Sequence, residues 1–330
     1  MHTVYFDSGT SNSRAYLIRE HQTVDFAKKN VGSKDVSISG NNMVLLYGLK
    51  ELYKQLLERN GLTDGDIDEI YASGMVTCPF GIKEVSHITT PVSLKKLRDS
   101  IYTHYEPKLF CRNIFLIRGV KTISEDYFPD IKDIAEVNNV RGEEIEIFGL
   151  LSGLQDEYEN SNLAIFLPGS HTHVAYVRQG VLCDILSTFS GELHHAIASE
   201  TIISASIRDP IEKLDNEMVL LGYKYLKEYG LNRALYIAHA MKIFNISDNT
   251  EIKSYISGVI NGGTILAFKK VLTKKWRDIN AIIVAGGNVM VQIDEIILKR
   301  TINNIQIISV PSSDTDSFAV KGFIKMLKQG

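Results

Sequence analysis

The sequence predicts an α/β protein built from two similar halves, and three observations carry this prediction. Short β-prone runs alternate with apolar patterns of helical spacing along the chain, which is typical of mixed α/β domains. Two strand–turn–strand segments, residues 4–17 and 164–177, resemble each other. A late apolar run, Ala281–Ala285, leads directly into Gly286-Gly287. We therefore expect a duplicated fold in which a polar hairpin opens each half.

The first hairpin carries the polar stretch Asp7–Arg14 between the β-prone runs Thr3–Phe6 and Ala15–Ile18,. Gly9 allows the main chain to turn tightly and to approach a ligand closely. The turn also has short donor side chains, at Thr10, Ser11, Asn12 and Ser13. Exposed backbone N–H groups with such donors suit an anion such as phosphate. Asp7, at the strand end, would hold a magnesium ion through water. An ordinary polar hairpin explains the same pattern. This stretch alone therefore does not decide between a phosphate site and a plain turn.

The second hairpin repeats the first without a gap. The identical pairs are Phe6 with Phe166, Gly9 with Gly169, Ala15 with Ala175, and Tyr16 with Tyr176. Thr10 against Ser170 is a conservative match, and His171 follows directly. Two such units, each opening one half of the chain, indicate a duplicated domain. The expected arrangement is two phosphate-binding hairpins that face each other across a cleft.

Composition narrows the class of protein. The chain has 330 residues, of which 44% are hydrophobic and 23% charged, enough for two globular domains,. Its net charge of -3 gives no reason to expect nucleic acid or an acidic membrane as partner,. Cys78, Cys111 and Cys183 have no metal-binding or redox spacing,. The chain starts in a strand without a leader, and no apolar run approaches the ~18 residues of a membrane span. We expect a cytoplasmic protein.

The expected elements of the first half follow from periodicity and turn residues. They are a strand over Thr23–Lys28, a helix over Asn42–Leu57, a strand over Ile67–Ala72, a helix over Leu94–Tyr102, a strand over Asn113–Gly119, an irregular stretch over Lys121–Glu136, and a helix from Arg141 to Leu151. The third of these runs into the loop Ser73–Gly81, and α/β sheets usually place ligands in such loops. The polar stretch Asp156–Asn162 sets the boundary between domains 1–159 and 160–330,.

The second half repeats this order. After the hairpin we expect a strand over Leu182–Leu186, a helical region with a long insertion to about Asn249, a helix over Ile252–Lys270, strands over Ala281–Ala285 and Ile305–Val310, and a helix over Asp316–Leu327. The expected long helix contains Gly258, Gly262 and Gly263. Because these residues lack side chains, another backbone or a flat ligand can approach that helix closely.

The chemistry of the hairpins indicates phosphoryl transfer. The chain contains neither G-x-x-x-x-G-K-[ST] nor G-x-G-x-x-G,. Two glycine-bearing hairpin tips and a late strand–Gly–Gly turn instead resemble the architecture of actin, sugar kinases and heat-shock ATPases. This resemblance implies two duplicated ribonuclease-H-like domains across a nucleotide cleft. In that case the two hairpins would hold the phosphates of ATP, and Gly286 and Gly287 would adjoin the adenine. Phosphoryl transfer needs positioning, magnesium and charge stabilisation more than covalent help.

A kinase that acts on a hydroxyl also benefits from a carboxylate that takes the proton. Glu143 is our candidate, because Gly142-Glu143-Glu144 stands where glycerol kinase and its relatives carry Gly-Asp-Gln-Gln. Acidic residues are also ordinary in the first turn of a helix, which explains the two glutamates without any catalytic role. Glu144 and Asp184 stay open as alternative candidates for the base. His171 and His173 lack a third ligand for a metal, and His171 is better placed to donate to substrate or phosphate.

Several motifs together resemble the 2-dehydro-3-deoxygalactonokinase family of bacterial sugar-acid kinases. Asp7–Arg14 is similar to the family's D-W-G-T-T-N-x-R, Ser73–Met75 to A/S-G-M, Val140–Glu144 to x-R-G-E-E, Leu167–Thr172 to L-P-G-T-H-S, and Thr188–Leu193 to T-F-x-T-G-E-L. The match runs in order over most of the chain. It departs at Ser8, where the family has Trp, at His173-Val174, where it tends to have Lys-Trp, and in the loop after Met75.

The resemblance implies transfer from ATP, with Mg²⁺, to the 6-hydroxyl of 2-dehydro-3-deoxy-D-galactonate in galactonate breakdown. It implies substrate contacts from Asn12, Arg14, Met75, Arg141 and Glu144. The departures concern the sugar acid more than the phosphoryl transfer, so a kinase of another 2-keto-3-deoxy sugar acid is one alternative. A non-catalytic nucleotide-binding regulator of the same fold is another. We expect small-molecule partners and allow for a homodimer.

Overall fold

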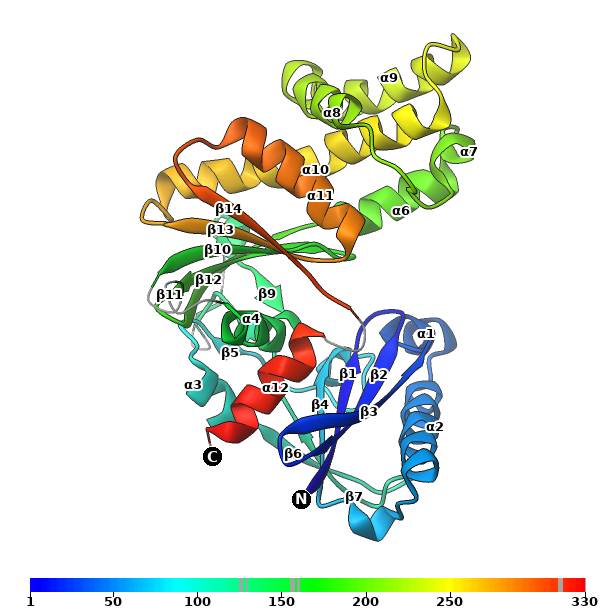
Figure 1. Ribbon diagram of the computed structural model, residues 1–330, viewed down its shortest axis with the longest axis vertical. Coiled ribbons are helices and arrows are strands. Elements are labelled where there is room, and N and C mark those ends of the chain that lie inside the picture. The colour runs from blue at the N-terminus through cyan, green and yellow to red at the C-terminus, as the bar shows by residue number, and fades with distance from the viewer. Residues whose placement is uncertain (125–126, 129, 155–157, 159–160, 314–316, 330) are drawn as a thin grey trace. The chain divides into compact units, whose positions relative to one another are not determined.

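The computed structural model describes residues 1–124, 127–128, 130–154, 158, 161–313 and 317–329 (Figure 1). The chain separates into two compact units. Unit 1 comprises the described residues of Met1–Asn160, Arg178–Ile185 and Asp314–Gly330, and unit 2 those of Ser161–Val177 and Leu186–Ser313. Most of the predicted boundary stretch, Asp156–Asn162, falls outside the described residues. The division into 1–159 and 160–330 therefore stays a prediction.

Unit 1 is built on a six-stranded sheet in the order β3-β2-β1-β4-β7-β6. These strands are β1 (His2–Ser8), β2 (Ser13–Arg19), β3 (Gln22–Lys29), β4 (Glu69–Gly74), β6 (Tyr102–Glu106) and β7 (Arg112–Leu116). Strand β1 pairs antiparallel with β2 and parallel with β4, so Asp7 lies between Arg14 and Ser73. The predicted hairpin and the strand that leads into Ser73-Gly74 are confirmed, and they meet at one edge of the sheet.

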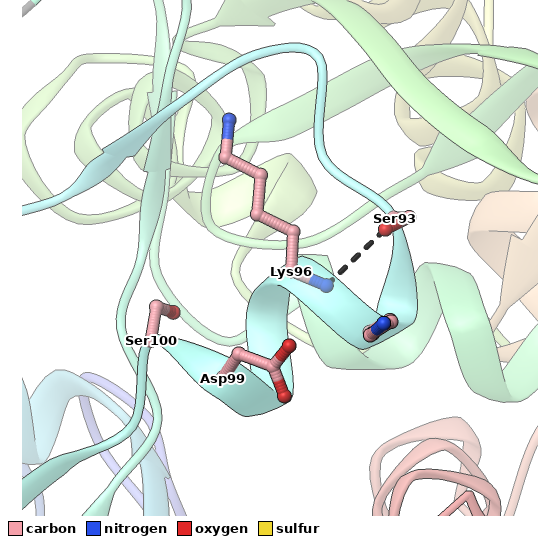
Figure 2. A pocket seen from close by; sticks show the side chains of 5 residues that line it. Ser93, Lys96, Asp99 and Ser100 are labelled. Atoms are coloured by element: carbon pink, nitrogen blue, oxygen red, sulfur yellow. Dashed lines mark hydrogen bonds between the residues drawn. The ribbon is translucent and has the colours of Figure 1, made fainter.

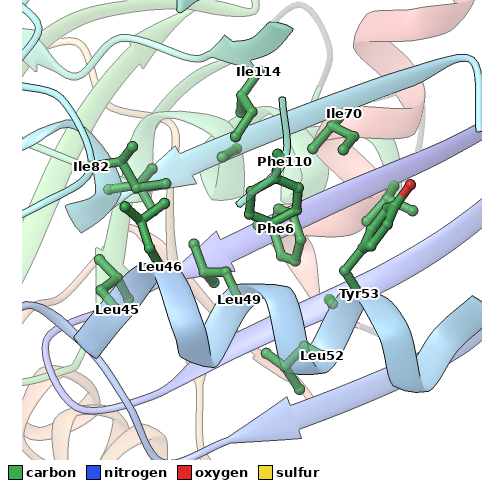
Figure 3. Packing of buried hydrophobic residues seen from close by; sticks show 14 of the residues in the cluster. Phe6, Leu45, Leu46, Leu49, Leu52, Tyr53, Ile70, Ile82, Phe110 and Ile114 are labelled. Atoms are coloured by element: carbon green, nitrogen blue, oxygen red, sulfur yellow. The ribbon is translucent and has the colours of Figure 1, made fainter. Parts of the chain in front are cut away.

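Helix α2 (Met43–Asn60) covers one face of this sheet and forms the core of unit 1 (Figure 3). Its leucines recur every three or four residues, so Leu45, Leu49 and Leu52 lie on one buried face,. They belong to the same core as Phe6 from β1 and Phe110. The helix ends at Asn60 because Gly61 adopts a left-handed conformation, with φ of 63°,.

The helix predicted over Leu94–Tyr102 is too long. Helix α3 (Leu94–Asp99) ends three residues earlier, and Tyr102 begins β6. The β-prone residues Tyr102, Thr103 and Tyr105 favour the strand. Short elements complete the region. They are α1 (Ser33–Ser39), β5 (Ile88–Thr89), β8 (Val120–Lys121), β9 (Asn139–Val140), and the 3-10 turns η1 (Asp64–Asp66), η2 (Met75–Thr77) and η3 (Ile134–Glu136).

Helix α4 (Glu143–Ser152) is held by the C-terminal helix α12 (Phe318–Lys328) (Figure 1). A Cβ atom at Gly149 would lie 1.8 Å from the Phe318 carbonyl oxygen, and one at Gly322 would lie 2.0 Å from the Ile145 carbonyl oxygen. Only glycine allows the two helix backbones to touch in this way. Phe323 of α12 stacks on Tyr5 of β1, with ring centroids 4.3 Å apart. The start of α4 is thus fixed relative to the sheet.

The second sheet has five strands in the order β12-β11-β10-β13-β14, and all of it except part of β12 and the last residue of β11 belongs to unit 2. Its strands are β10 (Asn162–Leu167), β11 (Thr172–Arg178), β12 (Val181–Thr188), β13 (Ala281–Gly286) and β14 (Gln306–Pro311). Counted from the first strand of each half, the order third, second, first, fourth is the same as in unit 1. This shared order agrees with the predicted duplication.

The helices of unit 2 are α6 (Ser190–Glu200), α7 (Ser204–Ile207), α8 (Asn216–Tyr229), α9 (Leu231–Ile243), α10 (Asn249–Lys274) and α11 (Asn288–Thr301). The predicted insertion before Asn249 is thus helical, and α8 packs along α10. A Cβ atom at Gly258 would lie 2.0 Å from the Val219 carbonyl oxygen, so the expected close backbone approach at this glycine is confirmed. None of the helices in the described part of the chain is long and apolar enough to cross a membrane.

Candidate functional site

The first hairpin tip is closed by its own hydrogen bonds. The Gly9 N–H donates to the Asn12 carbonyl oxygen at 2.8 Å, and the hydroxyls of Ser8 and Ser13 lie 2.8 Å apart. The start of α1 covers the outer side, where the Lys34 N–H donates to the Thr10 carbonyl oxygen at 3.0 Å. A Cβ atom at Gly32 would lie only 2.3 Å from that oxygen. The tip is therefore held in one shape, as a preformed anion site requires.

Asp7 and Arg14 face each other across β1 and β2. Asp7 is only 7% exposed, and its Oδ2 lies 3.2 Å from Arg14 Nη1. Within the described residues, no three His, Cys, Asp or Glu side chains form a group that could hold a metal. In kinases Mg²⁺ is commonly bound by one or two carboxylates together with substrate phosphates, so the Asp7 carboxylate would fit the ion.

Three chain segments meet beside this ion pair. Gly74, at the end of β4, has φ of 83°, and a Cβ atom there would lie 2.4 Å from the Ser8 carbonyl oxygen. Gly142, directly before α4, has φ of 113°, and its Cβ atom would lie 3.4 Å from the Gly74 Cα. Residues with a side chain rarely adopt such backbone angles. Three segments therefore converge here: the first hairpin, the Ser73–Met75 loop and the start of α4. A common phosphate and substrate site, as predicted from the sequence, requires this convergence.

The two glutamates at the start of α4 differ in environment. Glu143 is half-buried, and its Oε2 accepts a hydrogen bond from the Arg141 N–H at 3.1 Å. Glu144 is fully buried, and its Oε2 accepts from the Gly142 N–H at 2.8 Å. Burial, and then the charge of Glu143, raise the pKa of Glu144 to about 8. Glu144 is thus protonated at neutral pH, and Glu143 is the better candidate for a base.

Glu146, one turn further along α4, was not predicted as a site residue. Burial, and then the negative charges of Asp7 and Glu143, raise the pKa of the Glu146 carboxyl well above its usual range, while Arg14 opposes this shift. Glu146 therefore belongs to the same electrostatically coupled cluster of side chains as Asp7. Its spacing of three residues from Glu143, on the same helix face, is the sequence signal that could have identified it.

The second hairpin has a similar frame in unit 2. The Glu192 N–H donates to the Ser170 carbonyl oxygen at 2.8 Å, and a Cβ atom at Gly191 would lie 2.2 Å from the Gly169 carbonyl oxygen. Gly286 has φ of 148°, and its Cβ atom would lie 3.5 Å from Pro168 Cδ. The second hairpin, the start of α6 and the Gly286-Gly287 turn are thus neighbours.

The remaining candidates are engaged locally. The His171 ring lies 6.0 Å from the His173 ring and 5.3 Å from the Phe189 ring, between centroids. His173 Nδ1 lies 2.9 Å from the Ser187 hydroxyl. Asp184, on β12, accepts a hydrogen bond from the Ile185 N–H at 2.9 Å. A shallow depression of about 400 Å³ on α3 is lined by Ser93, Lys95, Lys96, Asp99 and Ser100, and it includes none of the predicted site residues (Figure 2).

Comparison with known proteins agrees with these motifs. The family model of 2-keto-3-deoxy-galactonokinase matches residues 7–324. Among solved structures, a Sinorhizobium meliloti protein described as a 2-dehydro-3-deoxygalactonokinase is similar, with a TM-score of 0.76, 16% identity, and coverage of 99% of this chain and 98% of that chain. Curated proteins give no match.

Two further solved structures are similar at lower scores. One is the activator of the 2-hydroxyisocaproyl-CoA dehydratase from Clostridium difficile, with a TM-score of 0.49, 12% identity, and coverage of 100% of this chain and 95% of that chain. The other is (R)-2-hydroxyglutaryl-CoA dehydratase component A from Acidaminococcus fermentans, with a TM-score of 0.48, 11% identity, and coverage of 100% of this chain and 98% of that chain. The fold is that of the Sinorhizobium meliloti protein, and the predicted α/β fold class is confirmed. The chain belongs to the 2-keto-3-deoxy-galactonokinase family and is an ATP-dependent kinase of 2-keto-3-deoxygalactonate.

Proposed function

We propose that this kinase transfers the γ-phosphoryl group of ATP, with Mg²⁺, to the 6-hydroxyl of 2-keto-3-deoxygalactonate, and that it does so in the cytoplasm as a step of galactonate breakdown. One observation supports this proposal most directly. The first hairpin, the Gly74 turn and the start of α4 converge on Asp7, and these are the segments that carry the family's motifs. The net charge of -3 supports the further proposal that no nucleic acid takes part,.

Asp7 is proposed to hold the magnesium ion. Its carboxylate is nearly buried at the end of β1, and Arg14 orients it from the neighbouring strand. The bound ion would neutralise charge on the transferred phosphoryl group. Arg14, Asn12 and Met75 are proposed to contact the sugar acid. Arg14 can then serve both the Asp7 carboxylate and a substrate oxygen, because a guanidinium has five N–H donors.

Glu143 is proposed to accept the proton of the attacking hydroxyl. The Arg141 N–H holds its carboxylate at 3.1 Å, so the side chain is oriented before substrate arrives. Glu144 is proposed to donate to the substrate, because its raised pKa of about 8 leaves a proton on the carboxyl at neutral pH. Asp184 stays the reserve candidate for the base.

The phosphates are proposed to lie against Gly9, Thr10 and Ser11 of the first hairpin and against Gly169, Ser170 and His171 of the second. Both tips offer backbone N–H groups held in fixed shape by the glycines behind them,. Gly286 and Gly287 are proposed to adjoin the adenine. No described atom outside its chain neighbours lies within 4 Å of a Cβ position at Gly287, which suits a flat ring there.

A coupled assay of ADP release tests the proposal. Magnesium-ATP is supplied with 2-keto-3-deoxygalactonate, with its gluconate epimer and with other small sugar acids. ADP release that depends on the first acceptor and stops on chelation of magnesium would support the proposal. Release only with another acceptor would move the substrate assignment, and silence across the panel with ATP still bound would favour a non-catalytic role. Mass spectrometry of the product then identifies the phosphorylated hydroxyl.

A further inference from the structure

The guanidinium of Arg141, expected above to contact the sugar acid, is engaged by the protein itself. Arg141 Nη1 donates to the Thr77 hydroxyl at 2.7 Å, and Nη2 donates to the Val85 carbonyl oxygen at 2.9 Å. His87 Nδ1 lies 3.4 Å from the same Nη2. All three partners lie in the segment that follows β4, so Arg141 ties this segment to the start of α4.

The ring of His87 is suited to this contact. Burial, and then the positive charges of Arg141 and Lys121, lower the pKa of His87 to about 4. The imidazole is therefore neutral at physiological pH, and one of its ring nitrogens can accept a hydrogen bond from the neighbouring guanidinium. A Cβ atom at Gly119 would lie 2.7 Å from both His87 Cδ2 and Arg141 Cγ. The two side chains are thus packed against the same backbone.

Thr77 carries the connection further, to the Gly74 turn. Its side chain is fully buried, and its hydroxyl donates to the Gly74 carbonyl oxygen at 3.0 Å while it accepts from Arg141. Gly74 has the left-handed backbone that places it against Ser8 of the first hairpin. Beside it, the Ser73 hydroxyl lies 2.6 Å from the Tyr5 hydroxyl. The Arg141 guanidinium is therefore connected, through the Thr77 hydroxyl, to the end of the sheet at which Asp7 lies.

The main chain of Arg141 reaches the proposed base. Its N–H donates to Glu143 Oε2 at 3.1 Å. One residue thus joins the Glu143 carboxylate at one end to the Gly74 turn at the other. A shift of either contact would move the carboxylate relative to Asp7, and misplacement by about 1 Å can cost about 10²-fold in rate.

We propose that Arg141 and Thr77 are positioning residues of this kinase, which hold the Gly74 turn and Glu143 in register for phosphoryl transfer, and that Arg141 is not the cation that pairs with the carboxylate of the sugar acid. This inference rests on the role proposed above for Glu143. It assigns to Arg141 a task different from the substrate contact implied by the motif, and it brings Thr77 into the site.

Steady-state kinetics of Thr77→Val, Thr77→Ser and Arg141→Lys test the inference, with 2-keto-3-deoxygalactonate and ATP varied in turn. Valine removes the hydroxyl at nearly constant shape, while lysine keeps the charge and loses the planar fork. We expect Thr77→Val and Arg141→Lys each to lower kcat by at least ~10-fold, with KM for the sugar acid within ~3-fold of wild type. Thr77→Ser retains the hydroxyl and should restore kcat to within ~3-fold of wild type.

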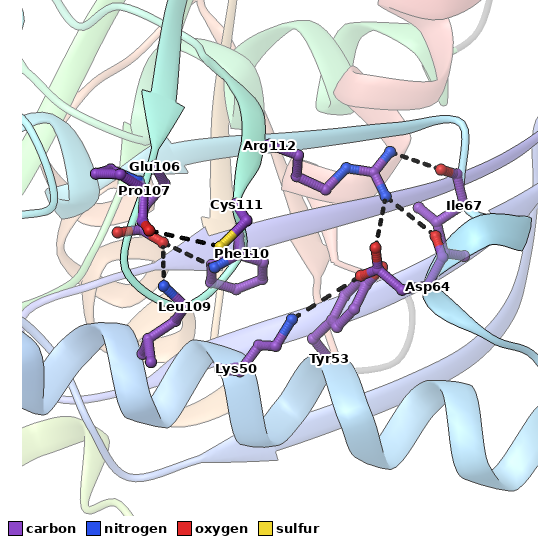
Figure 4. A network of polar contacts seen from close by, with 10 residues as sticks. All are labelled: Lys50, Tyr53, Asp64, Ile67, Glu106, Pro107, Leu109, Phe110, Cys111 and Arg112. Carbon is purple, nitrogen blue, oxygen red and sulfur yellow. Dashed lines mark hydrogen bonds and ion pairs between the residues drawn. The ribbon is translucent and has the colours of Figure 1, made fainter.

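Two matched controls come from the same unit. Thr122→Val removes a hydroxyl that donates to the Glu136 carbonyl oxygen at 3.0 Å. Arg112→Lys removes a guanidinium that donates to the Ile67 carbonyl oxygen at 2.6 Å (Figure 4). The same guanidinium donates to the Asp68 carbonyl oxygen at 3.0 Å. Both variants should leave kcat unchanged. The double variant of Arg141→Lys with Thr77→Val should lose little more than either single variant, because residues that act as one unit are not additive.

The opposite kinetic pattern overturns the inference. A rise of ~10²-fold in KM for the sugar acid with unchanged kcat in Arg141→Lys would make Arg141 a substrate ligand. Normal kinetics of Thr77→Val would also overturn it. If Thr77→Val does not fold, Arg141→Lys alone decides by the same split. Absence of ADP release by the wild-type protein would refute the proposed function instead, so the two failures are distinguishable.

Discussion

The two hairpins share a backbone design and differ in charge. Behind each tip lies a glycine at the start of the next helix, Gly32 in unit 1 and Gly191 in unit 2, whose Cβ atom would collide with a hairpin carbonyl. In the repeat alignment, however, the places of Asp7 and Arg14 are taken by the buried residues Leu167 and Val174. The comparison teaches that the duplicated fold supplies backbone donors twice, whereas this carboxylate and its cation were kept or acquired in only one copy.

The largest effect is expected for Asp7→Asn, which removes the charge that distinguishes the first hairpin. Turnover should fall by at least ~10³-fold, because the neutral amide binds magnesium much more weakly than the carboxylate does. ADP release is the measurement. Asp25→Asn is the matched control. Asp25 lies on β3 of the same sheet, and its Oδ1 is 2.9 Å from Nη2 of Arg59. Retained turnover in Asp7→Asn would remove the magnesium role from Asp7.

The next effect sharpens the contrast within unit 1. Glu143→Gln should lower turnover by at least ~10²-fold with little loss of ATP affinity, as expected for a general base. Glu144→Gln should keep turnover within ~3-fold at neutral pH. The reason is that the pKa of about 8 already leaves Glu144 protonated, and glutamine imitates that form. The checks are ADP release and ATP titration calorimetry.

Either of two results would contradict this assignment. Near-normal turnover of Glu143→Gln would move the base to Glu144 or Asp184. A loss of ~10²-fold in Glu144→Gln at neutral pH would show that its ionised form acts, against the direction of its pKa shift. The pH profile of Glu144→Gln offers an additional readout, because any step near pH 8 that belongs to this carboxyl is lost in the variant,.

Much of this contrast could be predicted from the sequence. The hairpins, the glycine turns and Glu143 are local features, marked by turn residues and by short motifs. Contacts between distant segments could not be predicted. Nothing in the sequence near Thr77 shows that its hydroxyl receives Arg141, which is 64 residues away in the chain. The raised pKa values of Glu144 and Glu146 likewise depend on burial in the folded protein.

The errors in secondary structure have a similar cause. The run from Leu94 to Tyr102 has a helical pattern in the sequence, yet Tyr102 enters the sheet as the first residue of β6, beside β7. The insertion before Asn249 has mixed polarity because only one face of α8 is buried against α10. Local pattern predicted that helices lie there, and tertiary packing decides where each of them ends.

A smaller effect compares the two hairpins directly. Gly32→Ala and Gly191→Ala both force a methyl group onto a hairpin carbonyl, at 2.3 and 2.2 Å. Gly191→Ala should raise KM for ATP by ~10-fold with kcat nearly unchanged, because it displaces only phosphate donors. Gly32→Ala should raise KM similarly and also lower kcat, since it displaces the hairpin that Asp7 adjoins. Equal kcat values for the two variants would remove the functional contrast between the hairpins.

A helical glycine of unit 2 provides the control for these substitutions. No atom of the described residues, beyond its neighbours and its own helix turn, lies within 4 Å of a Cβ position at Gly263 in α10. Gly263→Ala should therefore leave both kinetic constants unchanged and stabilise the helix by up to about 1 kcal/mol. Thermal unfolding of the three alanine variants separates loss of fold from displacement of a hairpin.

The smallest effect on turnover is expected for a buried carboxyl in unit 2. Asp294, on α11, is fully buried, and its Oδ1 accepts a hydrogen bond from Asn261 Nδ2 at 2.9 Å. Within the described residues its Oδ2 has no partner. Burial raises the pKa of Asp294 to about 7. Asp294→Asn should keep turnover within ~2-fold, because the amide oxygen can still accept from Asn261 and the residue lies outside the proposed site.

The effect of Asp294→Asn on stability should depend on pH in a defined direction. The folded protein binds this proton more tightly than the unfolded chain, whose aspartate titrates near pH 3.9. Wild-type stability therefore falls as pH rises between about 4 and 7, by up to about 1.4 kcal/mol per pH unit, and the loss is complete above that window. The variant lacks this loss. Urea unfolding at about pH 5 and about pH 8 should show the stability of the variant, relative to wild type, increasing with pH. A difference that is constant with pH, or that decreases, would mean that Asp294 is ionised in the folded protein, and unit 2 would then contain a buried charge of its own.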